Sequence, residues 1–312
     1  MKHLLSGWRF VPTVLAALFV LSACESVPVK PQATEPVAQS PSSSAPKPRP
    51  KPVVALALGG GGAKGFAHIG VIKALEAQGI QPDIVIGTSA GSVIGALYAA
   101  GLNGFELQEL AIPFEDASVK DFELPDRGLV KGESLARFVN TAVRNQPIEK
   151  LSRKFGAVAT RLSTGDAVVF RTGDTGTAVR ASSSVPVIFR PVAISGAEYV
   201  DGGLVSPVPV SLARQMGATF VIAVDISDVP SQGKTGSTVE VVLQSLTIMG
   251  RAVANADLPH ADVVIRPDIR SLSSVDFKSR HLASLEGEKA VARELADLKA
   301  RLAQFPERPP AR

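Results

Sequence analysis

The segment IVIGTSAGSVI, residues 84–94, predicts a strand, a tight turn around one serine, and a helix. Its first three residues form an apolar run typical of a buried strand, and apolar residues recur at helical spacing after the turn. The turn has the form Gly87-x-Ser89-x-Gly91, and the two glycines let the chain pass close on either side of the serine. The serine hydroxyl should emerge where the amino-terminal dipole of the following helix favours negative charge. We therefore predict Ser89 as the nucleophile of an acyl transfer; the alternative is a small-residue turn in an α/β protein.

The amino terminus predicts a secretory leader over residues 1–23. Its apolar run at residues 11–21 follows two basic residues and is too short for a comfortable membrane span. The leader ends in Leu21-Ser22-Ala23-Cys24, which resembles the lipobox of bacterial lipoproteins. This resemblance implies cleavage before Cys24, the only cysteine, and acylation of that residue; an ordinary cleavage site beside an incidental thiol is the alternative. Glu25, where an inner-membrane lipoprotein would carry Asp, implies a lipid anchor on the periplasmic face of the bacterial outer membrane.

Composition divides the rest of the chain. Residues 24–52 contain the lipidated cysteine and a Pro/Ser-rich tether that cannot bury enough apolar surface to fold. Residues 53–305 are enough for one α/β domain, and residues 306–312 form a carboxyl-terminal tail. The net charge of +4 is spread along the chain without a basic block, so a nucleic-acid binder is not expected. The sequence leaves the oligomeric state open.

A second glycine-rich turn follows the apolar run at residues 53–58. The turn formally matches G-x-G-x-x-G through Gly60, Gly62 and Gly65, but Asp83 stands before the next strand instead of at its end, which argues against a dinucleotide site. The Walker pattern also fails, because Gly65 follows Lys64 where Ser or Thr is required. Adjacent parallel strands place their carboxyl ends side by side, so this turn should face Ser89. We predict an oxyanion hole at Gly60, Gly61 and Gly62.

The candidates for the general base are the four histidines and the more numerous carboxylates. His3 lies in the leader, and the sequence leaves His68, His260 and His281 open as bases. Asp201 stands out because it ends a predicted strand on the turn Asp201-Gly202-Gly203. An ordinary aspartate ionises near pH 3.9, so an aspartate base predicts activity at lower pH than a histidine base, unless its site raises the pKa.

Three segments, in chain order, resemble the signatures of the patatin-like phospholipase family. They are Gly60-Gly61-Gly62-Ala63-Lys64-Gly65, Gly87-Thr88-Ser89-Ala90-Gly91 and Asp201-Gly202-Gly203, with supporting matches over most of residues 53–292. The resemblance implies an α/β/α sandwich with a mostly parallel sheet, a Ser89–Asp201 dyad without histidine, and metal-independent hydrolysis without a cofactor. Lys64 stands where many relatives have Arg, which keeps the charge but loses the bidentate fork. Arg161 replaces an acidic residue common in related bacterial proteins.

We therefore predict a serine acyl hydrolase acting on phospholipid or lysophospholipid esters at a membrane. The alternatives are an esterase or transacylase on other acyl groups, a non-catalytic lipid-binding protein and, third, a nucleotide-binding module. Four further segments carry expectations: a loop or cap at residues 114–132, a helix at 135–143, a polar loop at 227–237 and a closing amphipathic helix at 282–302. Ser182 to Ser184 lack a glycine turn, so we expect them to line the site or to serve a structural role.

Overall fold

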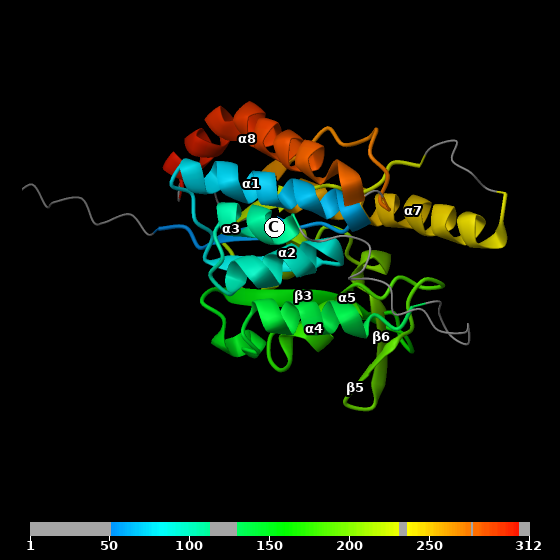
Figure 1. Ribbon diagram of the computed structural model, residues 1–312. Helices are drawn as coiled ribbons and strands as arrows, with labels where there is room; N and C mark the ends of the chain where they lie inside the picture. Colours follow the sequence, from blue (N-terminus) through cyan, green and yellow to red (C-terminus); the bar gives the residue numbers. More distant parts are fainter. Residues whose placement is uncertain (1–50, 113–129, 231–235, 276, 306–312) are drawn as a thin grey trace, which may run out of the picture. The chain divides into compact units, whose positions relative to one another are not determined.

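The computed structural model describes residues 51–112, 130–230, 236–275 and 277–305 (Figure 1). The predicted leader, Cys24, nearly all of the tether and the carboxyl-terminal tail lie outside these ranges. So do residues 113–129, which make up most of the segment predicted as a loop or cap. Within the described ranges, no helix combines the length and hydropathy that crossing a membrane requires.

One mixed sheet forms the centre of the fold, with strand order β5-β6-β3-β2-β1-β7-β8 and β4 attached to β3. Strands β8, β7, β1, β2 and β3 run parallel, whereas β4, β5 and β6 pair antiparallel. The strands are β1 Val54–Leu58, β2 Ile84–Thr88, β3 Lys154–Arg161, β4 Ala167–Phe170, β5 Val192–Ile194, β6 Ala197–Asp201, β7 Phe220–Val224 and β8 Val263–Ile265. The predicted, mostly parallel α/β sheet is confirmed.

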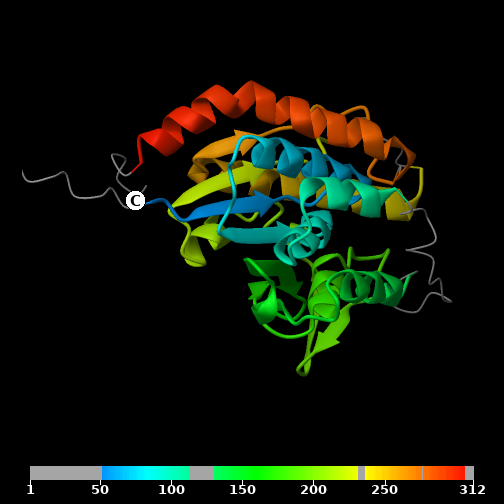
Figure 2. The ribbon, with the colours of Figure 1, turned by 60° about the vertical axis from the view of Figure 1, so that its left-hand side comes forward.

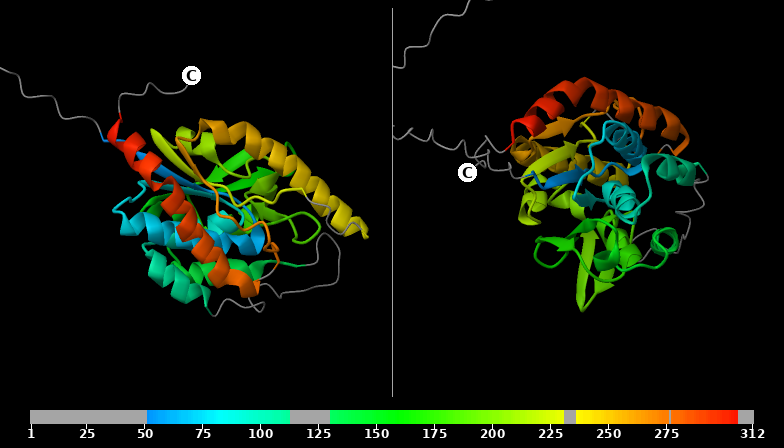
Figure 3. Two further views of the ribbon diagram at one scale, coloured as in Figure 1. Left: turned by 90° about the horizontal axis from the view of Figure 1, so that it is seen from above. Right: turned by 90° about the vertical axis from the view of Figure 1, so that its left-hand side faces the viewer.

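Helices cover both faces of this sheet. They are α1 Phe66–Ala77, α2 Ala90–Ala99, α3 Gly104–Ala111, α4 Glu133–Ala142, α5 Thr175–Ser182, α6 Val210–Gln215, α7 Thr238–Asp257 and α8 Arg280–Ala303. Alternate side chains of β1 divide the core, because Leu56 and Leu58 pack with α1, α2 and α8, whereas Ala55 and Ala57 pack with α6 and the end of α7. Figure 3 shows α7 and α8 on different sides of the strands. The result is a three-layer α/β/α arrangement.

The predicted strands at residues 53–58 and 84–86 correspond to β1 and β2, and the helices predicted at 135–143 and 282–302 correspond to α4 and α8. Helix α8 lies along α1 (Figure 2). Two glycines permit this approach, since a Cβ on Gly70 would stand 1.8 Å from Ser284 O and one on Gly287 would stand 2.1 Å from Ala67 O. The apolar face of α8 therefore packs into the core, as predicted, through buried residues such as Val291 and Leu298.

The register of β3 brings two distant parts of the sequence together. Thr88 at the end of β2 pairs with Val158, and Asp201 at the end of β6 pairs with the next residue, Ala159. Both partners lie on one edge of β3, because β4 pairs along the opposite edge. The residue after Thr88 is Ser89, so the sheet places the predicted nucleophile beside the predicted base.

Candidate active site

Ser89 sits on a strained backbone between β2 and α2. Its φ of 53° and ψ of −124° are unusual for a residue with a side chain, and such strain is often found at nucleophilic turns. The neighbouring glycines permit the turn, since a Cβ on Gly87 would stand 2.2 Å from Gly91 O and one on Gly91 would stand 2.2 Å from Leu58 O. The turn therefore has room for a side chain at Ser89 and not at its flanking glycines.

Asp201 offers one free carboxylate oxygen. Its Oδ1 accepts the Gly203 N–H at 2.6 Å, whereas Oδ2 is buried and has no hydrogen-bond partner of normal geometry among the described residues. Burial raises the pKa of Asp201 to about 6, while the nearby Ser89 hydroxyl and the Gly203 N–H oppose part of that rise. Hydrogen bonds to a catalytic base often tighten only when substrate binds. Oδ2 is thus the atom available to take a proton from Ser89.

This pKa changes one expectation from the sequence. An aspartate base with a pKa of about 6 titrates close to an ordinary histidine, so a pH profile alone does not separate the two. The sequence predicted activity at lower pH for an aspartate base unless its site raised the pKa, and burial raises the pKa of Asp201 in this way.

Residues Ser182 to Ser184 hold the backbones of both predicted dyad residues. The Ser182 hydroxyl accepts the Ser89 N–H at 3.0 Å and donates to Val158 O in β3. The Ser184 carbonyl accepts the Asp201 N–H at 2.9 Å. Ser183, in turn, lines the adjacent cavity. Both expected roles, structural and site-lining, therefore occur in this segment.

The glycine-rich turn lies against the nucleophile, since a Cβ on Gly60 would stand 3.2 Å from Ser89 Cβ. The Gly60 N–H donates a hydrogen bond to Pro207 O at 2.9 Å. Of the three amides predicted to form the oxyanion hole, that of Gly60 is therefore already occupied. In the described part of the chain, the amides of Gly61 and Gly62 have no such partner. They are the donors that remain for an oxyanion.

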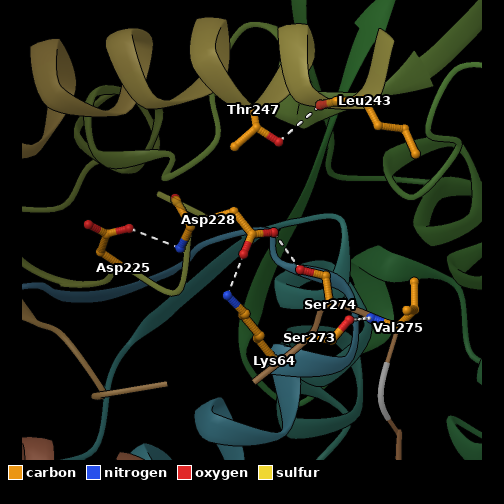
Figure 4. A network of polar contacts seen from close by, with 9 residues as sticks. Lys64, Asp225, Asp228, Leu243, Thr247, Ser273, Ser274 and Val275 are labelled. Carbon is orange, nitrogen blue, oxygen red and sulfur yellow. Dashed lines mark hydrogen bonds and ion pairs between the residues drawn. The ribbon is translucent and has the colours of Figure 1, made fainter. Parts of the chain in front are cut away.

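Lys64 secures this turn to two neighbouring segments (Figure 4). The buried Lys64 Nζ pairs with Asp228 Oδ1, and the Ser274 hydroxyl donates to Asp228 Oδ2. The Ser274 carbonyl also accepts the Ala63 N–H at 2.7 Å. A point-charge ammonium suffices for this contact, so Lys64 holds the turn without the arginine fork common in relatives.

The three histidines left open by the sequence do not line the cavity beside Ser89. His68 Nε2 donates to Gly59 O at 2.8 Å, and burial lowers its pKa to about 4. Neither His68 nor His260 nor His281 is among the residues that line the cavity beside Ser89. Arg161, the other noted departure, lies over the Tyr199 ring at 5.8 Å.

A cavity of about 540 Å³ opens beside Ser89 and Asp201. Most of its other walls are apolar, and they come from α1, α2, α3, α4 and α7. The apolar lining residues include Phe66, Ile69, Val93, Ile94, Leu97, Leu107, Leu135, Phe138, Phe189, Leu243 and Leu246. Such a lining suits an acyl chain. The structure describes no group of three or more His, Cys, Asp or Glu side chains placed to hold a metal ion.

Helix α7 is a part of the site that was not predicted from the sequence. Its start carried a usable signal, because Ser237 and Glu240 form a capping box, with the Glu240 N–H donated to the Ser237 hydroxyl at 3.2 Å. The helix contributes Thr247 and Arg251 to the cavity. The polar loop predicted at residues 227–237 ends where α7 begins; its residues 231–235 are outside the described ranges.

A protein-family model for patatin-like phospholipases matches residues 56–214, which is half of the chain and includes all three glycine-rich segments. The chain belongs to the patatin-like phospholipase family. Membership in this family supports lipid acyl hydrolysis as the general activity.

Individual relatives extend the comparison. An uncharacterized NTE family protein of Mycobacterium tuberculosis is 30% identical over 259 residues, covering 74% of this chain and 44% of that protein. The patatin-like phospholipase domain-containing protein 6 of Mus musculus is 33% identical over 222 residues, covering 68% of this chain and 16% of that protein. The chain therefore spans less than half the length of these curated relatives. The crystal structure of VipD from Legionella pneumophila covers 80% of this chain and 67% of its own at 14% identity, with a TM-score of 0.48.

Proposed function

We propose that this chain hydrolyses acyl esters of phospholipids or lysophospholipids through Ser89, with Asp201 as general base. The observation that carries the proposal is the placement of Ser89 beside a buried carboxylate oxygen that has no other partner among the described residues, at the wall of an apolar cavity. A strained serine, a base and unoccupied amides are the parts that acyl transfer requires.

The proposed cycle has two halves. Asp201 Oδ2 takes the Ser89 proton as Oγ attacks the ester carbonyl, and the Gly61 and Gly62 amides hold the oxyanion. Collapse of the tetrahedral intermediate expels the alcohol, which receives the proton from Asp201. A water then gives its proton to Asp201 while attacking the acyl-enzyme, and the proton returns to Ser89 Oγ as the fatty acid leaves.

The apolar cavity favours lipid esters over small polar esters. If an acceptor alcohol replaced water in the second half, the chain would be a transacylase. A non-catalytic lipid-binding protein would keep the cavity without a reactive Ser89. We also propose that Cys24 anchors the chain in the periplasmic face of the outer membrane, where lipid substrate is present.

A fluorophosphonate probe separates these functions, because it labels a serine only where the nucleophile and its base operate together. We expect one labelled site in the wild-type chain and none in Ser89→Ala. Incubation with a mixed lipid extract, followed by mass spectrometry, should then show free fatty acid and lysolipid. An unlabelled wild-type protein would favour the lipid-binding function, and acyl groups appearing on added alcohols would favour transacylation.

A further inference from the structure

A cationic group stands on the wall of an otherwise apolar cavity. Arg251 of α7 is the only Lys, Arg or His among the described residues that line it. Lys64 is the nearest alternative by sequence, but it is buried, pairs with Asp228 and does not line the cavity. The Arg251 side chain is 24% exposed and lines the cavity, so part of it is accessible to a bound molecule.

Helix α7, which carries Arg251, lies close to the turn that follows Asp201, and Arg251 lines the same cavity as Ser89 and Asp201. The neighbouring residue Gly250 approaches the turn after Asp201, since a Cβ on Gly250 would stand 3.5 Å from Gly203 O. Gly203 is the residue whose N–H binds Asp201. A group bound to Arg251 would therefore occupy the same cavity as an ester at Ser89.

The charge around Arg251 is only partly neutralised. Arg251 Nη1 contacts Asp225 Oδ2 at 3.0 Å, and Arg266 Nε contacts the same oxygen at 3.3 Å. Two guanidinium groups thus share one buried carboxylate, which leaves one net positive charge. Arg266 is exposed and does not line the cavity. The remaining guanidinium donors of Arg251 have no partner among the described residues.

A second polar group accompanies this charge. Ser227 lines the cavity, its N–H donates to Asp225 Oδ1 at 3.1 Å, and its buried hydroxyl has no partner in the described ranges. Burying an unsatisfied hydroxyl is unfavourable, so an acceptor supplied by a ligand would relieve the cost. A guanidinium and a hydroxyl together match the several acceptor oxygens of a phosphoryl group.

We propose that Arg251, assisted by Ser227, binds the phosphoryl group of the lipid headgroup while the ester lies at Ser89. This proposal rests on the proposed function, and it identifies the feature that selects phospholipids over neutral acylglycerols. Asp225 is a positioning residue in this account, because it orients Arg251 while leaving guanidinium donors free for the ligand.

The experiment compares two substrates with the same acyl chain, 1-palmitoyl-lysophosphatidylcholine and 1-palmitoylglycerol, in identical nonionic detergent micelles. The readout is the ratio of their kcat/KM values, in which a general loss of activity cancels. We expect Arg251→Gln to lower the ratio about 10- to 100-fold, as for loss of a charge-assisted contact, mainly through KM for the phospholipid. The ratio for Arg251→Lys should lie between those of the wild type and Arg251→Gln, because lysine keeps the positive charge but lacks the bidentate guanidinium fork.

Arg266→Gln is the comparison variant, since it removes the other guanidinium on Asp225, and with it one positive charge, without altering the cavity wall; its ratio should fall much less than that of Arg251→Gln, because the free donors of Arg251 remain. Equal ratios in wild type and Arg251→Gln would overturn the proposal. Failure of the wild type to hydrolyse either lipid would instead refute the proposed function. In that case, equilibrium binding of the same two lipids to Ser89→Ala and to Ser89→Ala with Arg251→Gln still decides the phosphoryl site. Binding of palmitate, the fatty-acid product, is measured to the same two proteins. If Arg251→Gln weakens binding of palmitate but not of the lysophospholipid, Arg251 binds the product carboxylate, and the phosphoryl proposal is wrong.

Discussion

Asp201→Asn should abolish activity and at the same time stabilise the folded protein at alkaline pH. Asparagine keeps an oxygen that can accept the Gly203 N–H, but it cannot take a proton from Ser89. Loss of a general base typically lowers kcat/KM about 10²- to 10⁴-fold. The gain in stability arises because the wild-type carboxylate ionises in a site that is only 6% exposed.

The magnitude follows from the raised pKa of Asp201. Between pH 3.8 and about pH 6 the Asp201 carboxyl stays protonated in the native protein, whereas in the unfolded chain it has lost its proton. The wild-type free energy of unfolding should therefore fall as pH rises from about 4 to about 6, and this contribution should be constant above that range. A tenfold change in proton affinity is worth about 1.4 kcal/mol, so the penalty amounts to about 3 kcal/mol. Asp201→Asn has no ionisable group at this position, so it does not carry this penalty.

Urea unfolding of both proteins at pH 4 and pH 8 measures this effect. We expect the stability of Asp201→Asn relative to wild type to increase by about 2.5 kcal/mol between the two pH values, because the unfolded carboxyl is already partly ionised at pH 4. In parallel, kcat/KM of the wild type on a soluble ester should show an acidic limb, falling as pH drops below about 6 and Asp201 becomes protonated. His260→Gln and His281→Gln are controls that should keep that limb, since neither residue lines the cavity. A relative stability independent of pH, or an active Asp201→Asn, would refute the assignment of Asp201 as a buried base.

Three further predictions concern the glycine-rich turn and the anchor. Gly61→Ala would place a Cβ 2.8 Å from Ile226 O, so we expect a loss of about 1–3 kcal/mol in unfolding free energy and of most activity; unchanged kcat would contradict Gly61 as a donor. Asp228→Asn should weaken the tie to Lys64 and lower kcat more than it raises KM, because it loosens the oxyanion amides without removing an apolar wall; an effect confined to KM would contradict this. Cys24→Ala should release the chain from membranes or leave it unprocessed, and mass spectrometry of wild-type protein without acyl groups would disprove the anchor.

The turn that carries the proposed nucleophile was predictable because its signal is local. Gly87, Ser89 and Gly91 lie within one turn, and the strand and helix around them have clear apolar periodicity. Asp201 was also visible, as a carboxylate at a strand end. The histidine alternatives could not be rejected from sequence, since the buried hydrogen bond between His68 and Gly59 depends on packing.

Other features of the site had no local signal. Strand β3, which was not predicted, decides which carboxylate meets Ser89, because Val158 and Ala159 pair with segments separated by more than a hundred residues. Arg251 lies on a helix whose spacing does not reveal that one face lines the cavity.

The sequence by itself determined the two strand–turn–helix segments β1–α1 and β2–α2, and it marked Ser89, the glycine-rich turn and Asp201 as chemically distinct. These are properties of short segments, set by backbone freedom, periodicity and residue type. The tertiary structure alone decided which amides stay unoccupied, since Gly60 loses its donor to Pro207. It alone also raised the pKa of Asp201 to about 6 and made Arg251 share the Asp225 carboxylate with Arg266. Burial and hydrogen-bond competition depend on groups far apart in the chain, so they arise only when the sheet has formed.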